Sequence, residues 1–226
     1  MAKVVAIIPV KPFDESKSRL SPVLKAEQRA ALAQAWFLQT LDRARKCPAI
    51  DQIIVVSRST WVLDAARTLA ATALEEREPG LNAALSHATE VAIGKGADAV
   101  CVIPTDLPLL TVDGLSDLLA QGIGAGGCLL VPDRREQGTN FLFVRPPVSA
   151  FYRFGADSFR RHRHAAIGAN LRPSLVYGSA ASFDIDEPGD WEEWQRGLAE
   201  RAVIQALVTA DIRRHSDVVP LEVRSS

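Results

Sequence analysis

The sequence predicts an α/β fold in which helices cover both faces of a mostly parallel sheet. Short apolar runs rich in β-branched residues, such as Val4–Val10 and Ala99–Pro104, alternate with longer segments of helical periodicity, such as Lys25–Lys46. The length of 226 residues suits one α/β domain with a full core. We therefore expect a single domain over residues 1–202 and a C-terminal tail, 203–226, which shows no strong pattern.

The remaining elements follow the same alternation as far as residue 131. Strands are expected at Ile53–Ser57, Thr72–Leu74 and Cys128–Val131, and helices at Thr60–Ala71, Leu81–Ile93 and Thr111–Gln121. Beyond them we expect a strand at Asn140–Val144, a basic helix around Ser158–His164 and a strand near Leu175–Tyr177. We interpret this last part as an added antiparallel section that closes over the site, and its Arg/His run as a solvated helix face.

Charge and cysteine usage exclude several classes of protein. The 26 basic and 27 acidic residues give a formal net charge of -1, so no overall field favours nucleic acid or an anionic membrane. The cysteines Cys47, Cys101 and Cys128 lack metal-ligand spacing, and the last two lie in apolar runs, as buried reduced thiols do. With no recognisable signal peptide and no apolar stretch of membrane-spanning length, we expect a cytoplasmic protein.

The strongest chemical signal is a carboxylate directly after a buried strand. The apolar run Val100–Ile103 is followed by Pro-Thr and then Asp106. Ligands of α/β sheets bind at the carboxyl ends of the strands, and a carboxylate there is a natural ligand for Mg²⁺ in phosphate chemistry. The alternative is that Asp106 only caps the turn before the helix at Thr111.

The first strand opens into a basic loop, KPFDESKSRLSP, instead of leading directly into a helix. Lys11, Lys17 and Arg19 therefore lie at the carboxyl end of a strand, where they can hold a polyphosphate. The loop contains no glycine, which disfavours a Walker loop or a dinucleotide-binding turn, and side-chain cations must neutralise the phosphates. A solvated surface loop is the alternative interpretation.

A second acidic segment, SFDIDEPGDW, lies near the end of the domain. Asp184 and Asp186 alternate about Ile185, which predicts a short strand with both carboxylates on one face. Two like charges side by side are unfavourable unless a cation joins them, so we favour a metal site shared with Asp106. Helix entry is the alternative, and it suits Glu187 and Asp190 better.

Two groups of small polar residues are candidates for ligand contacts. Gly80 and Asn82 begin a helix whose free amides and side-chain amide could meet a base or ribose, although an ordinary glycine turn and cap has the same pattern. The turns that contain Thr139, Gly155 and Ser158 offer N–H groups and hydroxyls to a phosphate or carboxylate.

With these residues assembled, the chain resembles the guanylyltransferases that activate a phosphorylated three-carbon acid for biosynthesis of a deazaflavin redox coenzyme. The motifs that carry the resemblance are, in order, PVKPFDESKSRLSP, GLNAAL, PTDLPLL, DRREQGTN, FGADSFRRH and FDIDEP. The resemblance covers residues 3–200. It implies the Rossmann-like three-layer αβα sandwich of the nucleotide-diphospho-sugar transferases, with a mixed, mostly parallel sheet. The absence of glycine between Lys11 and Pro22 argues against the similar molybdopterin guanylyltransferases.

The resemblance also implies GTP as donor, Mg²⁺ as cofactor and 2-phospho-L-lactate, phosphoenolpyruvate or 3-phospho-D-glycerate as acceptor. The residues that match are Lys11, Lys17 and Asp106 for catalysis, Pro9, Lys11, Arg19, Gly80 and Asn82 for the nucleotide, Thr139, Gly155 and Ser158 for the acid, and Asp106, Asp184 and Asp186 for the metal. Such an acid brings its own anionic nucleophile, so no general base is needed. A homodimer, and a downstream transferase that receives the product, are further expectations.

Two other functions remain open at this point. One is a metal-dependent nucleotidyltransferase that uses CTP or UTP on a sugar or alcohol phosphate, with the same carboxylates and lysines. The other is a nucleotide-binding or assembly protein without enzymatic activity, in which the three aspartates are structural.

Overall fold

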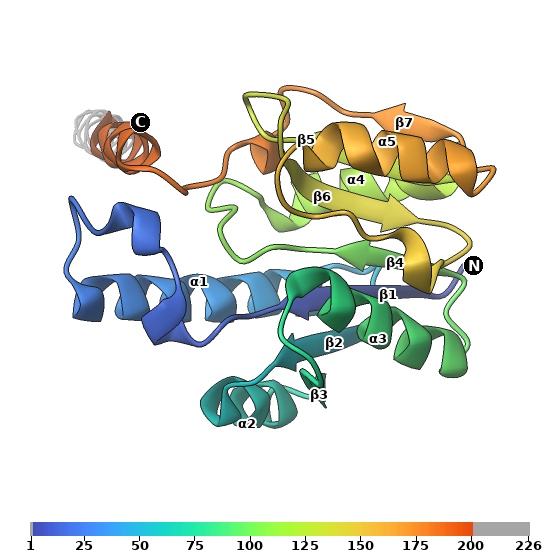
Figure 1. Cartoon of the computed structure of the whole chain (residues 1–226), viewed down its shortest axis with the longest axis horizontal. Helices are drawn as coiled ribbons and strands as arrows, with labels where there is room; N and C mark the ends of the chain where they lie inside the picture. Colours follow the sequence, from blue (N-terminus) through green and yellow to red (C-terminus); the bar gives the residue numbers. More distant parts are fainter. Residues whose placement is uncertain (1, 201–226) are drawn as a thin grey trace, which may run out of the picture. The chain divides into compact units, whose positions relative to one another are not determined.

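The protein, described by a computed structural model over residues 2–200, contains one seven-stranded sheet with the order β3-β2-β1-β4-β6-β5-β7 (Figure 1). The strands are β1 (Val4–Pro9), β2 (Gln52–Ser57), β3 (Thr72–Glu75), β4 (Ala99–Val102), β5 (Cys128–Pro132), β6 (Thr139–Val144) and β7 (Pro173–Leu175). All pairings are parallel except those of β6, which is antiparallel to β4 and β5. The sheet is therefore mixed and mostly parallel, as predicted.

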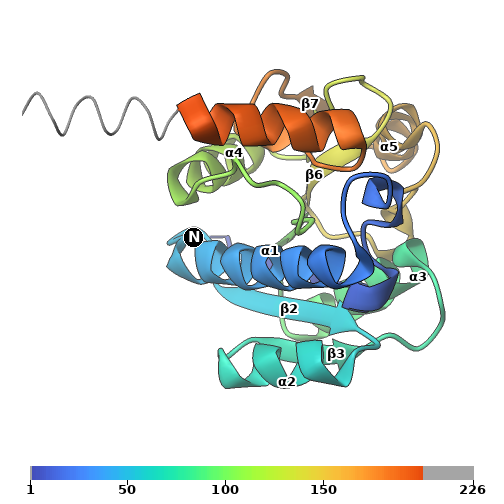
Figure 2. The ribbon, with the colours of Figure 1, turned by 90° about the vertical axis from the view of Figure 1, so that its left-hand side faces the viewer.

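Helices cover both faces of this sheet. The longer ones are α1 (Ala26–Lys46), α2 (Thr60–Thr68), α3 (Leu81–Gly94), α4 (Val112–Ala125) and α5 (Ser158–Gly168), and the short 3₁₀ turns are η1 (Phe13–Glu15), η2 (Ser18–Leu20), η3 (Ser149–Phe151) and η4 (Ala180–Ser182). Figure 2 shows α1 and α4 on one side of the sheet and α3 and α5 on the other. The predicted αβα sandwich is confirmed.

The central strand β1 shows why these runs are continuously apolar. Its residues Val4, Ala6 and Ile8 belong to one hydrophobic cluster, which also contains Phe37 of α1 and residues of α2 and α4. Val5 and Ile7 belong to the other cluster, with residues of α3 and α5. Because both faces of the strand are buried, no polar alternation is needed.

Strand β6 is antiparallel, as expected for this part of the chain, but it is not an added section that closes over the site. It is inserted inside the sheet, between β4 and β5, and all six of its residues are buried. Because β6 runs against its neighbours, its first residues, Thr139 and Asn140, lie at the edge where the parallel strands have their carboxyl ends. The insertion therefore brings two polar side chains to the ligand edge of the sheet.

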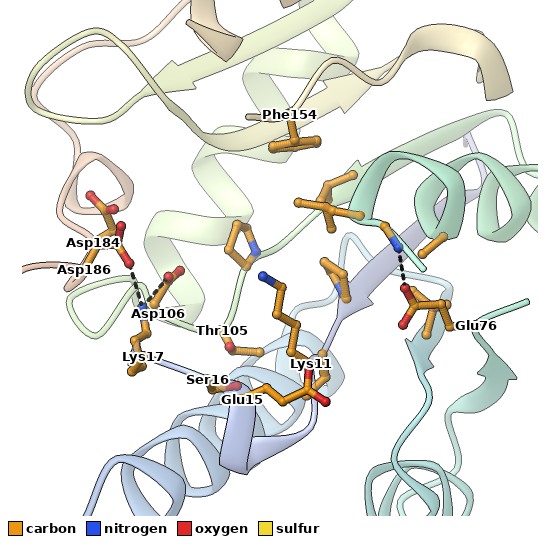
Figure 3. Close-up of a pocket in the computed structure, with 18 of the residues that line it drawn as sticks. Lys11, Glu15, Ser16, Lys17, Glu76, Thr105, Asp106, Phe154, Asp184 and Asp186 are labelled. Atoms are coloured by element: carbon orange, nitrogen blue, oxygen red, sulfur yellow. Dashed lines mark hydrogen bonds and ion pairs between the residues drawn. The ribbon is translucent and has the colours of Figure 1, made fainter. Parts of the chain in front are cut away.

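The short strand expected around Asp184 and Asp186 is wrong, because residues 183–186 belong to no strand. The segment is held instead by the N–H of Ile185, which donates to the main-chain carbonyl of Asp106 at 3.3 Å. Ile185 is fully buried, and Phe183 has extended backbone angles. Asp184 and Asp186 thus lie close together without a sheet ladder (Figure 3).

The described residues fall into two compact units, 2–186 and 187–200. In the second unit a helix covers 188–200, where the Asp190 carboxylate accepts a hydrogen bond from the N–H of Glu187 at 2.9 Å. Acidic residues therefore mark a helix entry there, as the alternative reading of this segment allowed. The tail expected at 203–226 lies outside the described residues.

Cys101 and Cys128 are buried free thiols, as predicted, and Cys47 is buried and free as well. Burial raises the pKa of Cys101 and raises that of Cys128 to about 12, so both are unreactive. Within residues 2–200, no helix combines the length and the apolar character that crossing a membrane requires.

Candidate active site

A cavity of about 530 Å³ lies at the carboxyl edge of the sheet (Figure 3). Its walls come from the ends of β1, β2 and β4, the beginning of β6 and the amino terminus of α3. Of the predicted site residues it contains Pro9, Lys11, Lys17, Arg19, Gly80, Asp106, Thr139, Asp184 and Asp186. This is the position at which open α/β sheets bind ligands.

Lys17 ties the basic loop to the acidic segments. Its Nζ donates to Asp106 Oδ2 at 2.6 Å and to the main-chain carbonyl of Ile185 at 2.6 Å, and it lies 4.0 Å from Asp186 Oδ1. The side chain is only 9% exposed, and its Nζ lies 5.7 Å from the centre of the Trp36 ring. Lys17 itself has a left-handed backbone conformation, with φ 56°. It is therefore a buried, fully engaged cation and not a surface solubiliser.

The acidic residues differ in how their charges are compensated. Arg19 forms an ion pair with Asp186, whereas Asp184 accepts a hydrogen bond from the Asn140 amide at 3.1 Å. Burial, and to a lesser extent the negative charge of Asp106, raises the pKa of Asp184 to about 6. A bound cation would relieve this repulsion, and a cation site here stays a prediction.

Replacing Asp184 by Asn is expected to stabilise the protein at pH 8, measured without divalent cations. The native state binds a proton at Asp184 more tightly than the unfolded state does, since the carboxyl pKa rises from 3.8 to about 6 on folding. Ionisation therefore penalises the fold above pH 6, and the penalty disappears as the pH falls towards 4. The gain should be on the order of 1 kcal/mol at pH 8.

Urea unfolding of both proteins at pH 8 and pH 4 measures this difference. Asp117→Asn, at an exposed position of α4, is the matched control and should show no pH-dependent gain. An Asp184→Asn variant less stable than the native protein at pH 8 would mean that the carboxylate is well solvated or well paired.

The three carboxylates fit Mg²⁺ only if water and substrate phosphates supply the rest of its ligands, as is usual in phosphate transfer. Among the described residues, no three His, Cys, Asp or Glu side chains are arranged to hold a metal ion by themselves. Mg²⁺ in such sites commonly takes one or two carboxylates and completes its shell with water and substrate phosphates. Asp106 with Asp184 or Asp186 matches that donor set, and the metal assignment stays a prediction.

Lys11 differs from Lys17 in being unengaged. Its side chain is exposed and reaches into the cavity between the acidic cluster and Glu76 (Figure 3). Within residues 2–200, no group forms a hydrogen bond or ion pair with its ammonium. Glu15 and Arg58, which also line the cavity, pair with each other. Lys11 is thus a cation available to a ligand phosphate.

The predicted acid-binding turn lies partly behind the cavity wall. Thr139 lines the cavity, whereas Gly155 and Ser158 do not. Ser158 is 2% exposed, and its hydroxyl donates to Thr139 Oγ1 at 3.5 Å. Gly155 has φ 118°, a conformation that L side chains rarely adopt, so a substitution there would strain the turn. A direct contact of Gly155 or Ser158 with the acid stays a prediction.

Asn82 has a second role that the sequence did not indicate. Its amide nitrogen donates to the main-chain carbonyl of Phe154 at 3.1 Å, and its amide oxygen accepts from the N–H of Phe154 at 2.8 Å. Phe154 lines the cavity, but Asn82 does not. The side chain therefore holds a wall residue in place, and its contact with guanosine stays a prediction.

Several cavity residues had no clear signal in the sequence. Glu76 lines the cavity and accepts a hydrogen bond from the N–H of Gly80 at 2.9 Å, but it stands in an ordinary charged loop. Asn140 ends the motif DRREQGTN and Phe154 begins the motif FGADSFRRH, but neither motif indicates that these two side chains line a cavity. The Arg/His run predicts a solvated helix face, but its member His162 is fully buried. The sequence does indicate this burial, because the helical spacing of His162 from Phe159 and Ala166 places all three on one face of α5.

Solved structures share this fold at low sequence identity. A crystal structure from Desulfovibrio desulfuricans G20, assigned to the nucleotide-diphospho-sugar transferases, has a TM-score of 0.67 and 17% identity over 83% of this chain and 84% of its own. A nucleotidyl transferase from Methanothermobacter thermautotrophicus has a TM-score of 0.62 and 13% identity over 89% of this chain and 100% of its own. These similarities confirm the nucleotide-diphospho-sugar transferase fold.

Sequence relatives are more specific. The family described as guanylyl transferase CofC like matches residues 4–196. A phosphoenolpyruvate guanylyltransferase of Sphaerobacter thermophilus is 36% identical over 191 residues, covering 84% of this chain and 91% of the relative. A 2-phospho-L-lactate guanylyltransferase of Methanobrevibacter smithii is 31% identical over 194 residues, covering 85% and 84%. With the predicted resemblance thus confirmed over most of its length, the chain belongs to the CofC-like family of guanylyl transferases.

Proposed function

We propose that the protein transfers GMP from GTP to the phosphate of a three-carbon acid, with release of pyrophosphate, in the biosynthesis of a deazaflavin coenzyme. The candidate acids are phosphoenolpyruvate, 2-phospho-L-lactate and 3-phospho-D-glycerate. The observation that carries the proposal is one cavity at the carboxyl edge of the sheet in which an unengaged Lys11 faces the acidic cluster of Asp106, Asp184 and Asp186. The names of the relatives make phosphoenolpyruvate the first acid to test.

The chemistry asks for alignment and charge neutralisation rather than proton removal. A phosphate oxygen of the acid attacks the α-phosphorus of GTP, and the bond between that phosphorus and the bridging oxygen of the β-phosphate breaks. Lys11 and Lys17 neutralise the departing pyrophosphate, and Arg19 contributes at the rim of the cavity. Thr139 meets the incoming acid. Mg²⁺, held by Asp106 with Asp184 or Asp186, would neutralise charge on the reacting phosphates.

Pyrophosphate release tests this function directly. GTP, ATP, CTP and UTP are each incubated with each of the three acids and with a sugar phosphate, with Mg²⁺ or with EDTA. We expect release only with GTP, one of the acids and Mg²⁺. Turnover of CTP or UTP with the sugar phosphate would establish the alternative nucleotidyltransferase. Nucleotide binding without release in any combination would favour a non-enzymatic role.

A further inference from the structure

His162 is a buried histidine whose two ring nitrogens both have partners. It lies in α5 and is fully buried, although Arg161 and Arg163 on either side are exposed. The main-chain N–H of Arg153 donates to Nε2 at 2.9 Å, and Nδ1 lies 2.9 Å from Thr139 Oγ1. The ring therefore connects a cavity residue, Thr139, with the chain next to Phe154.

These contacts define which nitrogen carries the hydrogen. A main-chain N–H can only donate, so Nε2 must present a lone pair to Arg153. Burial, together with the positive charges of Arg153 and Arg161, lowers the pKa of His162 to about 4, and the ring is neutral near pH 7. A neutral imidazole without hydrogen on Nε2 carries it on Nδ1. Towards Thr139 the ring is therefore a donor only.

The direction of the Thr139 hydroxyl follows from this tautomer. Its oxygen accepts from Nδ1–H of His162 and, at 3.5 Å, from the Ser158 hydroxyl. Neither contact uses the hydrogen of Thr139 itself. Thr139 is only 6% exposed, and it lines the cavity. Its hydroxyl hydrogen is thus free to point to the cavity, where it can donate to an anionic oxygen.

We propose that His162 is a positioning residue that makes the Thr139 hydroxyl a hydrogen-bond donor towards an anionic oxygen of the acid substrate. The proposal rests on the proposed function, because it takes Thr139 as part of the acid site. The same ring lies edge-to-face against Phe154, with centroids 4.6 Å apart, and stacks on Phe151 at 5.9 Å. One side chain therefore orients the hydroxyl and supports the adjacent cavity wall.

Steady-state kinetics with paired variants test the link between the two residues. His162→Gln keeps an acceptor for the Arg153 N–H but removes the donor at the Nδ1 position. We expect its KM for the acid to rise about tenfold or more, as for loss of one hydrogen bond to a charged group, with the KM for GTP nearly unchanged. Thr139→Val should have a similar effect. His164→Gln, at an exposed position of the same helix, is the matched control and should behave as the native protein does.

A double-mutant cycle separates positioning from structural support. If His162 acts through the Thr139 hydroxyl, His162→Gln should add little to the KM for the acid once Thr139 is Val. Fully additive effects, or a KM for the acid unchanged in His162→Gln, would overturn the inference while the guanylyl transfer of the native protein stands. A native protein that guanylylates none of the three acids would overturn the proposed function, and the inference with it.

Nitrogen-15 NMR of histidine-labelled native protein provides a test that does not depend on any variant folding. The two neutral tautomers give distinct patterns of ring nitrogen shifts. At pH 7 we expect His162 to be neutral with hydrogen on Nδ1, its signals being assigned in the native protein by nuclear Overhauser contacts of the ring with Phe151 and Phe154. Hydrogen on Nε2, or a doubly protonated ring, would overturn the proposal.

Discussion

Replacing Asp106 by Asn is expected to abolish turnover while the protein remains folded. Asn keeps the shape of the side chain but loses the negative charge that would hold Mg²⁺ and that pairs with Lys17 at 2.6 Å. The loss should be about a thousandfold or more in kcat, at the upper end of what one preorganised charge contact supplies. Pyrophosphate release at saturating GTP, acid and Mg²⁺ measures it.

The folded state of this variant is checked by circular dichroism and thermal unfolding. Asp117→Asn, at an exposed position of α4, serves as the control for a lost surface charge and should keep native activity. Asp186→Asn should act as Asp106→Asn does, and Asp184→Asn at least in part. Near-normal turnover of Asp106→Asn at high Mg²⁺ would contradict the assignment of this carboxylate to the metal.

Substituting Lys11 or Lys17 by Met should lower kcat by about tenfold or more, because each ammonium is proposed to meet negative charge on the departing pyrophosphate. The two variants should differ in stability. Lys11 is exposed and unengaged among the described residues, so its loss should change the free energy of unfolding by no more than about 0.5 kcal/mol. Lys17→Met leaves Asp106 without its partner and should unfold at a lower temperature.

Lys46→Met is the control for this pair, because the one ion pair of Lys46 within residues 2–200 is an exposed pair with Asp42 in α1. Kinetics and thermal unfolding of the three variants, measured in parallel, separate the two roles. If Lys11→Met kept native kcat, Lys11 would return to the solvated-loop interpretation. If Lys17→Met kept native kcat but lost stability, its role would be confined to holding the loop against Asp106 and Ile185.

Much of the fold was predictable because its signals are local. The strand β1 and the helix α1 each appear in the sequence as one uninterrupted pattern, so their positions follow from residue order alone. The position of Asp106 after β4 was enough to predict a ligand site, because parallel strands place their carboxyl ends at one edge. The antiparallel direction of β6 was predicted, but its place between β4 and β5 was not, since an apolar run shows that a strand is buried and not which strands lie beside it.

By itself the sequence determined the element types, the three-layer class, the chain positions of the lysines and aspartates, and the family to which they belong. Only the tertiary structure decided which partners these side chains have. Lys17 meets Asp106 and Ile185 across separations of 89 and 168 residues, and Thr139 meets His162 across 23. It also decided that Asn82 supports Phe154 and that His162 is buried. The physical reason is that periodicity records which face of an element is buried, whereas hydrogen bonds and charge pairs depend on the strand order and loop paths that bring distant residues within about 3 Å.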